Sequence, residues 1–73
     1  MPRYSESQLE TAKFLLARAC ERFGSTTFLG LKQALAFAYP GIEEEDCREL
    51  ALEAIFASAG EGKINIRQIL VES

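Results

Sequence analysis

The chain has no histidine and no tryptophan, and its 73 residues include only two cysteines. Without histidine it lacks the commonest general base and the commonest ligand of transition metals. It has no glycine-rich phosphate loop, and neither cysteine has a partner base in view. The acidic residues 43–46 are adjacent, so they splay around a helix instead of converging on a substrate. The sequence therefore predicts a protein that is not an enzyme and has neither catalytic residues nor a cofactor.

Grouped positive charge and long apolar runs are missing as well. Eight Lys and Arg residues are scattered among eleven Asp and Glu, giving a net charge of −3, whereas phosphate backbones attract grouped cations. No apolar run approaches the ~20 residues of a membrane span, and the start of the chain lacks the apolar middle segment of a signal peptide. We expect no nucleic-acid or membrane partner. We expect a cytosolic or nuclear location, with the cytoplasm, including its cytoskeleton, as first choice.

The apolar content is sufficient for one compact core. Hydrophobic residues make up 48% of the chain, and the aromatic residues are five Phe and two Tyr. These values are typical of a single small domain, which we place over residues 1–73. Cys20 falls on a predicted apolar helix stripe, and we expect Cys20 and Cys47 to be reduced, partly buried thiols.

Two segments repeat one apolar pattern at i, i+3, i+4 and i+7, and each is followed by a glycine. This spacing is typical of the buried face of a helix that ends at a glycine cap. The residues are Leu16, Ala19, Cys20 and Phe23 before Gly24, then Leu52, Ile55, Phe56 and Ala59 before Gly60. A short extended run follows each segment, so the chain reads as two helix–turn–strand–helix units.

Four helices are predicted in all. The first begins at Ser5 or Ser7, with Ser7 and Glu10 at capping-box spacing, and ends at Phe23. The second covers residues 31–39 and ends before Pro40-Gly41. The third covers residues 43–59, with acidic residues in its first turn that suit the helix dipole, and the fourth is a short helix over residues 66–71. Residues 25–29 and 63–66 read as very short strands.

This order resembles a pair of EF-hands, with units at residues 5–39 and 43–73. The stretch from Gly62 to Ile66 is similar to the place where that family has a glycine and then an aliphatic residue that joins two loops. In the first unit Phe28 or Leu29 takes the aliphatic place. The resemblance implies an all-α fold of two EF-hand-like helix-loop-helix units. It also implies a minimal two-stranded antiparallel link between residues 26–29 and 63–66.

The residues that would bind calcium in such a loop are absent. A calcium loop supplies about six or seven oxygens over 12 residues. If Gly62 is the central glycine, the first and third ligand places are Ala57 and Ala59, the last is Gln68, and only Glu61 is a carboxylate. The first unit has no acid between Glu21 and Glu43. We therefore predict no metal ligand and no specific calcium binding.

The predicted core combines the two repeated stripes with the aliphatic residues of the loops. Its members are Leu16, Ala19, Cys20, Phe23, Phe28, Leu35, Leu52, Ile55, Phe56, Ile64 and Leu70. Further bulky apolar residues exceed what one core face requires, and excess apolar surface in a small domain marks a contact site. The predicted partner-binding residues are Phe14, Leu15, Leu31, Phe37, Tyr39, Leu50 and Ile69.

The resemblance implies a calcium-independent protein–protein interaction module. Its partner would be an amphipathic helix of another protein, or a second copy of the chain. We expect the chain to be the N-terminal part of a larger scaffold or cytoskeletal protein.

Two other classes stay open. A small winged-helix-like, nucleic-acid-associated regulator fits the order of elements, but such a fold needs a basic recognition helix and the third predicted helix of this chain is acidic. An acyl-carrier-like bundle fits the size and charge, but Ser25 lacks the Asp-Ser-Leu setting of the cofactor arm.

Overall fold

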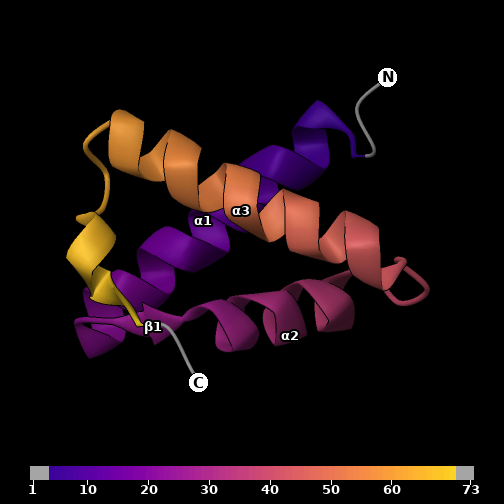
Figure 1. Cartoon of the computed structure of the whole chain (residues 1–73), viewed down its shortest axis with the longest axis horizontal. Coiled ribbons are helices and arrows are strands. Elements are labelled where there is room, and N and C mark those ends of the chain that lie inside the picture. The colour runs from indigo at the N-terminus through magenta and orange to yellow at the C-terminus, as the bar shows by residue number, and fades with distance from the viewer. Residues whose placement is uncertain (1–3, 71–73) are drawn as a thin grey trace.

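The computed structural model describes residues 4–70, which form a mainly helical domain (Figure 1). Within that part of the chain there are three α-helices, one short 3-10 helix and two very short strands. In chain order they are α1 (Glu6–Phe23), β1 (Thr26–Thr27), α2 (Phe28–Ala38), α3 (Glu44–Gly60), η1 (Ile66–Gln68) and β2 (Ile69–Leu70). Helix α3 crosses over α1, and α2 lies along one side of that pair (Figure 1). The prediction of a mainly α-helical chain is confirmed in outline.

Helix α1 is fixed at both ends by local hydrogen bonds. The hydroxyl of Ser5 accepts from the backbone N–H of Gln8 at 3.1 Å, and the Gln8 side chain accepts from the N–H of Ser5 at 2.8 Å. This is a capping box, but it uses Ser5 and Gln8 rather than the predicted Ser7 and Glu10. The helix ends at Gly24, whose φ of 80° is the left-handed conformation expected of a glycine cap.

Helix α2 begins earlier than the sequence predicted. Thr27 caps it, with the Thr27 hydroxyl accepting from the N–H of Gly30 at 2.9 Å. A Cβ at position 30 would lie 2.9 Å from that hydroxyl, so the cap requires glycine there. Phe28 and Leu29 therefore belong to the first turn of the helix and not to a strand.

The buried face of α3 is rotated relative to the predicted stripe. Its buried residues are Cys47, Leu50, Ala51, Ala54, Ile55 and Ser58. Because Ala51, Ala54 and Ser58 are small, they allow α1 to pack closely on α3. Phe56 falls on the outer side and is 65% exposed, and Leu52 is only half-buried. The placement of Phe56 in the core was wrong.

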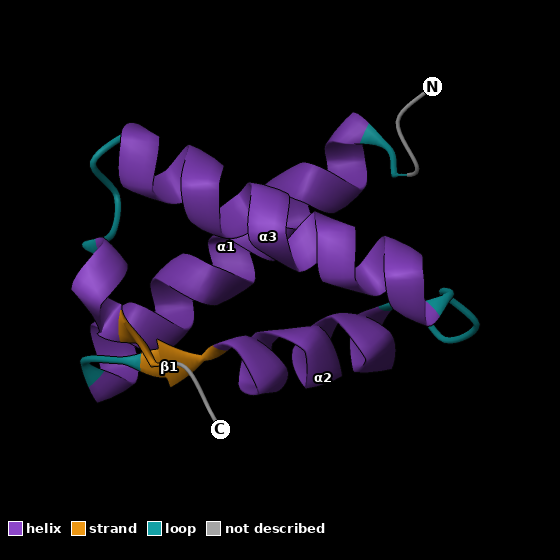
Figure 2. Ribbon diagram, viewed as in Figure 1, coloured by secondary structure: helices purple, strands orange, loops and turns teal. Residues whose placement is uncertain are grey.

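The predicted antiparallel link between the two halves is also wrong. Strand β1 pairs with β2 in parallel, with Thr26 opposite Ile69 and Thr27 opposite Leu70 (Figure 2). The chain reaches this register because residues 66–68 form η1 instead of continuing a strand. The fourth predicted helix is thus reduced to one 3-10 turn within the described residues, and its predicted end at residue 71 lies outside them.

Most of the remaining core predictions were correct. Leu16, Cys20, Leu35, Ile55 and Ile64 are buried as predicted, while Ala19 and Phe28 are half-buried. Two predictions were wrong: Phe23 is 74% exposed in the last turn of α1, and Leu70 is half-exposed. Successive strand residues face opposite sides, so Ile69 packs against the core and Leu70 points away.

Both cysteines, Cys20 and Cys47, are free thiols and both are buried. Among the helices of residues 4–70, none combines the length and the apolar character needed to cross a bilayer.

Candidate functional site

Helix α2 has an exposed face made of uncharged residues. Leu29, Gln33 and Phe37 stand at i, i+4 and i+8, and Ala36 lies beside them, so the four share one side of the helix. We call these four residues the α2 outer face. Phe37 is 89% exposed and Leu29 is 43% exposed, and Gln33 and Ala36 are exposed as well. The opposite side of α2 is fixed to the core by Leu31 and Leu35, both buried.

This face is unusual for a helix at the surface of a small domain. Lys32 is the one charged residue of α2, and its ammonium lies 5.1 Å from the centroid of the Phe28 ring, at the border of the outer face. By contrast, the exposed positions of α1 and α3 carry many charged side chains such as Arg18 and Glu53, although the rings of Phe14, Phe23 and Phe56 are exposed there as well. A helix that is apolar on nearly all sides is usually buried. The α2 outer face therefore has the composition of a covered surface.

A hollow of about 250 Å³ lies between α2 and the start of α3. It is lined by Leu29, Lys32, Gln33, Ala36, Ile42, Glu44 and Cys47. The Cys47 thiol donates a hydrogen bond to the carbonyl of Lys32 at 3.3 Å, and burial raises the pKa of that thiol. A protonated, buried thiol is a poor nucleophile, so the hollow offers shape and apolar contact rather than covalent chemistry.

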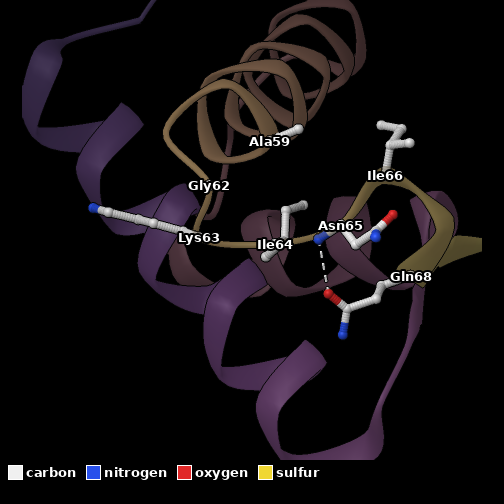
Figure 3. Close-up of a pocket in the computed structure, with 7 residues that line it drawn as sticks. All are labelled: Ala59, Gly62, Lys63, Ile64, Asn65, Ile66 and Gln68. Carbon is white, nitrogen blue, oxygen red and sulfur yellow. Dashed lines mark hydrogen bonds between the residues drawn. The ribbon is translucent and has the colours of Figure 1, made fainter.

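A second hollow, of about 560 Å³, lies between the end of α3 and η1 (Figure 3). Its polar side chains already hold the backbone. The Gln68 side chain accepts from the N–H of Asn65 at 2.9 Å and donates to the carbonyl of Gly24 at 3.0 Å. Asn65 in turn accepts from the N–H of Arg67 at 2.9 Å. These contacts close the C-terminal turn onto α1, which is a structural role.

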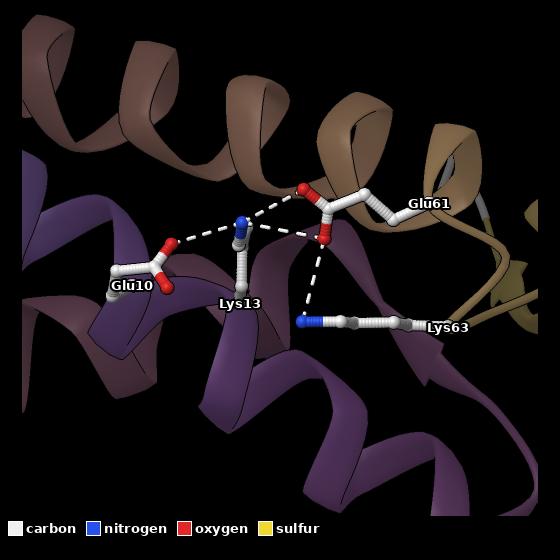
Figure 4. A network of polar contacts seen from close by, with 4 residues as sticks. All are labelled: Glu10, Lys13, Glu61 and Lys63. Carbon is white, nitrogen blue, oxygen red and sulfur yellow. Dashed lines mark hydrogen bonds and ion pairs between the residues drawn. The ribbon is translucent and has the colours of Figure 1, made fainter.

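A group of four charged residues joins α1 to the turn after α3 (Figure 4). The Lys13 ammonium lies 2.9 Å from the Glu10 carboxylate and 3.0 Å from that of Glu61, and Lys63 lies 3.4 Å from Glu61. Hydrogen bonds donated by Lys13 and then by Lys63 lower the pKa of Glu61, and the hydrogen bonds that Lys13 donates to Glu10 and Glu61 raise the pKa of Lys13. Every carboxylate here has a cation, so the network stabilises the fold and leaves no group suited to proton transfer.

The predicted partner-binding residues divide into three groups. Phe14 and Phe37 are exposed, although on different helices, and Leu15, Tyr39 and Ile69 are half-buried. Leu31 and Leu50 are buried in the core, so their prediction as contact residues was wrong. They lie on the inner faces of α2 and α3, where α2 packs against α3.

Sequence reasoning missed Leu29 and Gln33 as surface residues. The signal was available in the lone charge of residues 28–38 and in the spacing of Leu29, Gln33 and Phe37. It was obscured because residues 25–29 have the composition of a strand, and a strand there removes Leu29 from the helix.

The described residues contain no group of three or more His, Cys, Asp or Glu side chains that could hold a metal ion. The absence of calcium binding stays a prediction, as does the resemblance to EF-hands.

Comparisons of the chain with protein-family models, with curated proteins and with solved structures gave no match.

Proposed function

We propose that the protein is a non-catalytic, calcium-independent protein–protein interaction module that docks through the α2 outer face. One observation carries this proposal: a helix with a single charged residue has Phe37 89% exposed and Leu29 43% exposed on one side. Fully burying an exposed Phe or Leu side chain gains about 1.5–3 kcal/mol. Phe37 can gain most of that amount, whereas Leu29 is already more than half covered and gains less. A partner that covers both side chains therefore gains free energy from residues that contribute little to the domain's own core.

The hollow between α2 and the start of α3 supports the same docking surface. It shares Leu29, Gln33 and Ala36 with the α2 outer face and adds Ile42 from the far wall. Lys32 and Glu44 stand in its lining as one cation and one anion. An apolar strip bordered by a few charged groups is the composition of an interface with a dry centre and a polar rim.

The test compares two alanine variants of the α2 outer face with an alanine variant of an exposed phenylalanine on another helix. Phe37→Ala and Leu29→Ala change the α2 outer face, whereas Phe14→Ala removes a ring that is 59% exposed on α1. Each variant, purified and checked for helix content by circular dichroism, is used as bait in an extract of the cells that produce the protein. We expect the α2 variants to lose the recovered proteins at least tenfold, while Phe14→Ala retains them. Equal recovery by all three variants would show that docking does not use α2.

A further inference from the structure

We infer that the occupant of the α2 outer face is the same face of a second copy, packed antiparallel about a two-fold axis at Gln33. This inference rests on the proposed function, since it names the partner for that same surface. It uses three features of the face: the symmetry of its side chains, its self-complementary centre and its lack of charge.

Three of the four residues of the α2 outer face are symmetric in position about Gln33. Leu29 and Phe37 lie four residues before and after it, which is about 6 Å along the helix axis in each direction. In a two-fold interface, residue i contacts j while j contacts i. An antiparallel pair centred on Gln33 therefore places Leu29 of each copy against Phe37 of the other.

The antiparallel arrangement fits these side chains better than the parallel one. A parallel two-fold pair would oppose Phe37 with Phe37 at one end and Leu29 with Leu29 at the other, so the two helices would be wedged apart at one end. The antiparallel pair has one large and one smaller side chain at each end, which keeps the spacing even. It also sets the two helix dipoles in opposite directions.

Gln33 gives the centre of the pair a polar group that is complementary to itself. A side-chain amide has one acceptor oxygen and a donor NH₂ group, so two amides related by a two-fold axis can exchange hydrogen bonds. A single amide in an otherwise apolar helix seam is known to fix register and partner number. Gln33 thus selects one alignment of the pair, because a slipped register would bury its amide without a partner.

Charge does not oppose this pairing. The chain has a net charge of −3, yet the four residues of the α2 outer face carry no charge at all. Two copies can therefore approach through this face without placing like charges in the contact. Its border carries one cation and one anion, because Lys32 and Glu44 line the hollow that adjoins Leu29 and Gln33.

The extent of the face sets the strength of the expected dimer. Phe side chains bury about 150–250 Å² each, so Phe37, Leu29 and their small neighbours offer a few hundred Å² per copy. Stable complexes bury about 800 Å² per partner. The dimer is consequently weak and reversible, with a dissociation constant on the order of 0.1–1 mM.

Sedimentation equilibrium over roughly 10 μM to 2 mM tests the inference, because that range spans the expected dissociation constant. We expect the average mass of the natural chain to rise from 8.1 kDa toward twice that value. Gln33→Glu and Gln33→Lys each place like charges at the axis and should stay monomeric alone, whereas their equimolar mixture should dimerise. Position 33 is exposed, and Glu and Lys favour helix, so both variants should fold, which circular dichroism verifies. Phe37→Ala should abolish dimerisation and Phe14→Ala should leave it unchanged.

A natural chain that stays monomeric to 2 mM overturns the inference, as does a dimer that both charged variants retain. A monomeric chain whose Phe37→Ala variant still loses its recovered proteins leaves the proposed function standing and makes the occupant a different protein. A monomeric chain whose Phe37→Ala variant keeps every partner refutes both.

Discussion

Ser58 is the position where one substitution should stabilise the fold. Its side chain is fully buried in α3 beside Ala54 and Ile55, and among the described residues its hydroxyl has no hydrogen-bond partner. A buried polar group without a partner costs about 1–3 kcal/mol. Ser58→Ala removes that group and leaves the rest of the side chain in place.

Two smaller effects modify this gain. Alanine has a helix propensity about 0.5 kcal/mol better than serine. The missing oxygen leaves a void smaller than a methyl group, which costs less than ~1 kcal/mol. The net expectation for Ser58→Ala is about 1–2 kcal/mol of added stability, which in a domain of this size raises the melting temperature by roughly 5–15 °C.

Urea unfolding followed by circular dichroism measures this change. The samples should be dilute, so that self-association does not contribute. We expect a higher midpoint with an unchanged m-value. Ser7→Ala is the matched control, because Ser7 is an exposed serine of α1 and its replacement changes helix propensity alone. If Ser58→Ala is no more stable than the natural chain, the Ser58 hydroxyl is satisfied and the argument fails.

Three further predictions use the same unfolding assay. Gly24→Ala should lower the free energy of unfolding by about 1–2 kcal/mol, because φ is 80° at Gly24. Gly60→Ala should raise it by about 0.5–1 kcal/mol, because Gly60 lies at the right-handed end of α3 with open space around a Cβ. Equal effects of the two substitutions would contradict the glycine-cap account. Gln68→Glu should cost about 1–2 kcal/mol, since a carboxylate cannot donate to the Gly24 carbonyl, and an unchanged midpoint would show that this bond contributes nothing. Lys13 and Lys63 lower the pKa of Glu61, so the contribution of Glu61 to stability is present above its unfolded-state pKa and is lost as pH falls through its folded-state pKa. Glu61→Gln should therefore be less stable than the natural chain near pH 7 and equally stable near pH 2. A loss of stability that does not depend on pH would contradict this.

The ends of α1 could be predicted because their signals are local, whereas the glycine cap predicted for α3 was wrong, since Gly60 lies in the helix and Glu61 follows it in the right-handed conformation. Ser5 and Gly24 are the cap residues of α1, and each acts within a few residues of its own position. The start of α2 was missed because Thr27 and Phe28 also favour strands. Only the Thr27 hydroxyl and the absence of a Cβ at Gly30 decide in favour of a helix.

Features that depend on distant contacts could not be read from the sequence. The parallel register of Thr26 with Ile69 follows from how η1 closes the chain, to which Gln68 contributes by its bond to Gly24. The rotation of the α3 face, which leaves Phe56 outside, follows from close packing of α1 on small residues of α3. A prediction from the spacing of large apolar residues gives little weight to alanine and serine, so it places the buried face of α3 too far toward Phe56.

The candidate site was predicted in part. Phe37 was identified from its bulk and is the most exposed of the large apolar residues named here. Leu31 was assigned to the same surface, yet it lies six residues before Phe37, which places the two on different sides of the helix; the earlier start of α2 adds Leu29 to the outer side. The face could be drawn correctly only once the beginning of the helix was known.

Photo-crosslinking inside the cells that produce the protein tests the α2 outer face most directly. A photoreactive phenylalanine analogue is placed at position 37 in one variant and at position 14 in the other, since both rings are well exposed but lie on different helices. The account predicts crosslinked products from position 37, with the product of two copies a minor one because that dimer is weak, and few from position 14. Products that form equally from both positions, or only from position 14, would contradict the claim that α2 is the docking surface.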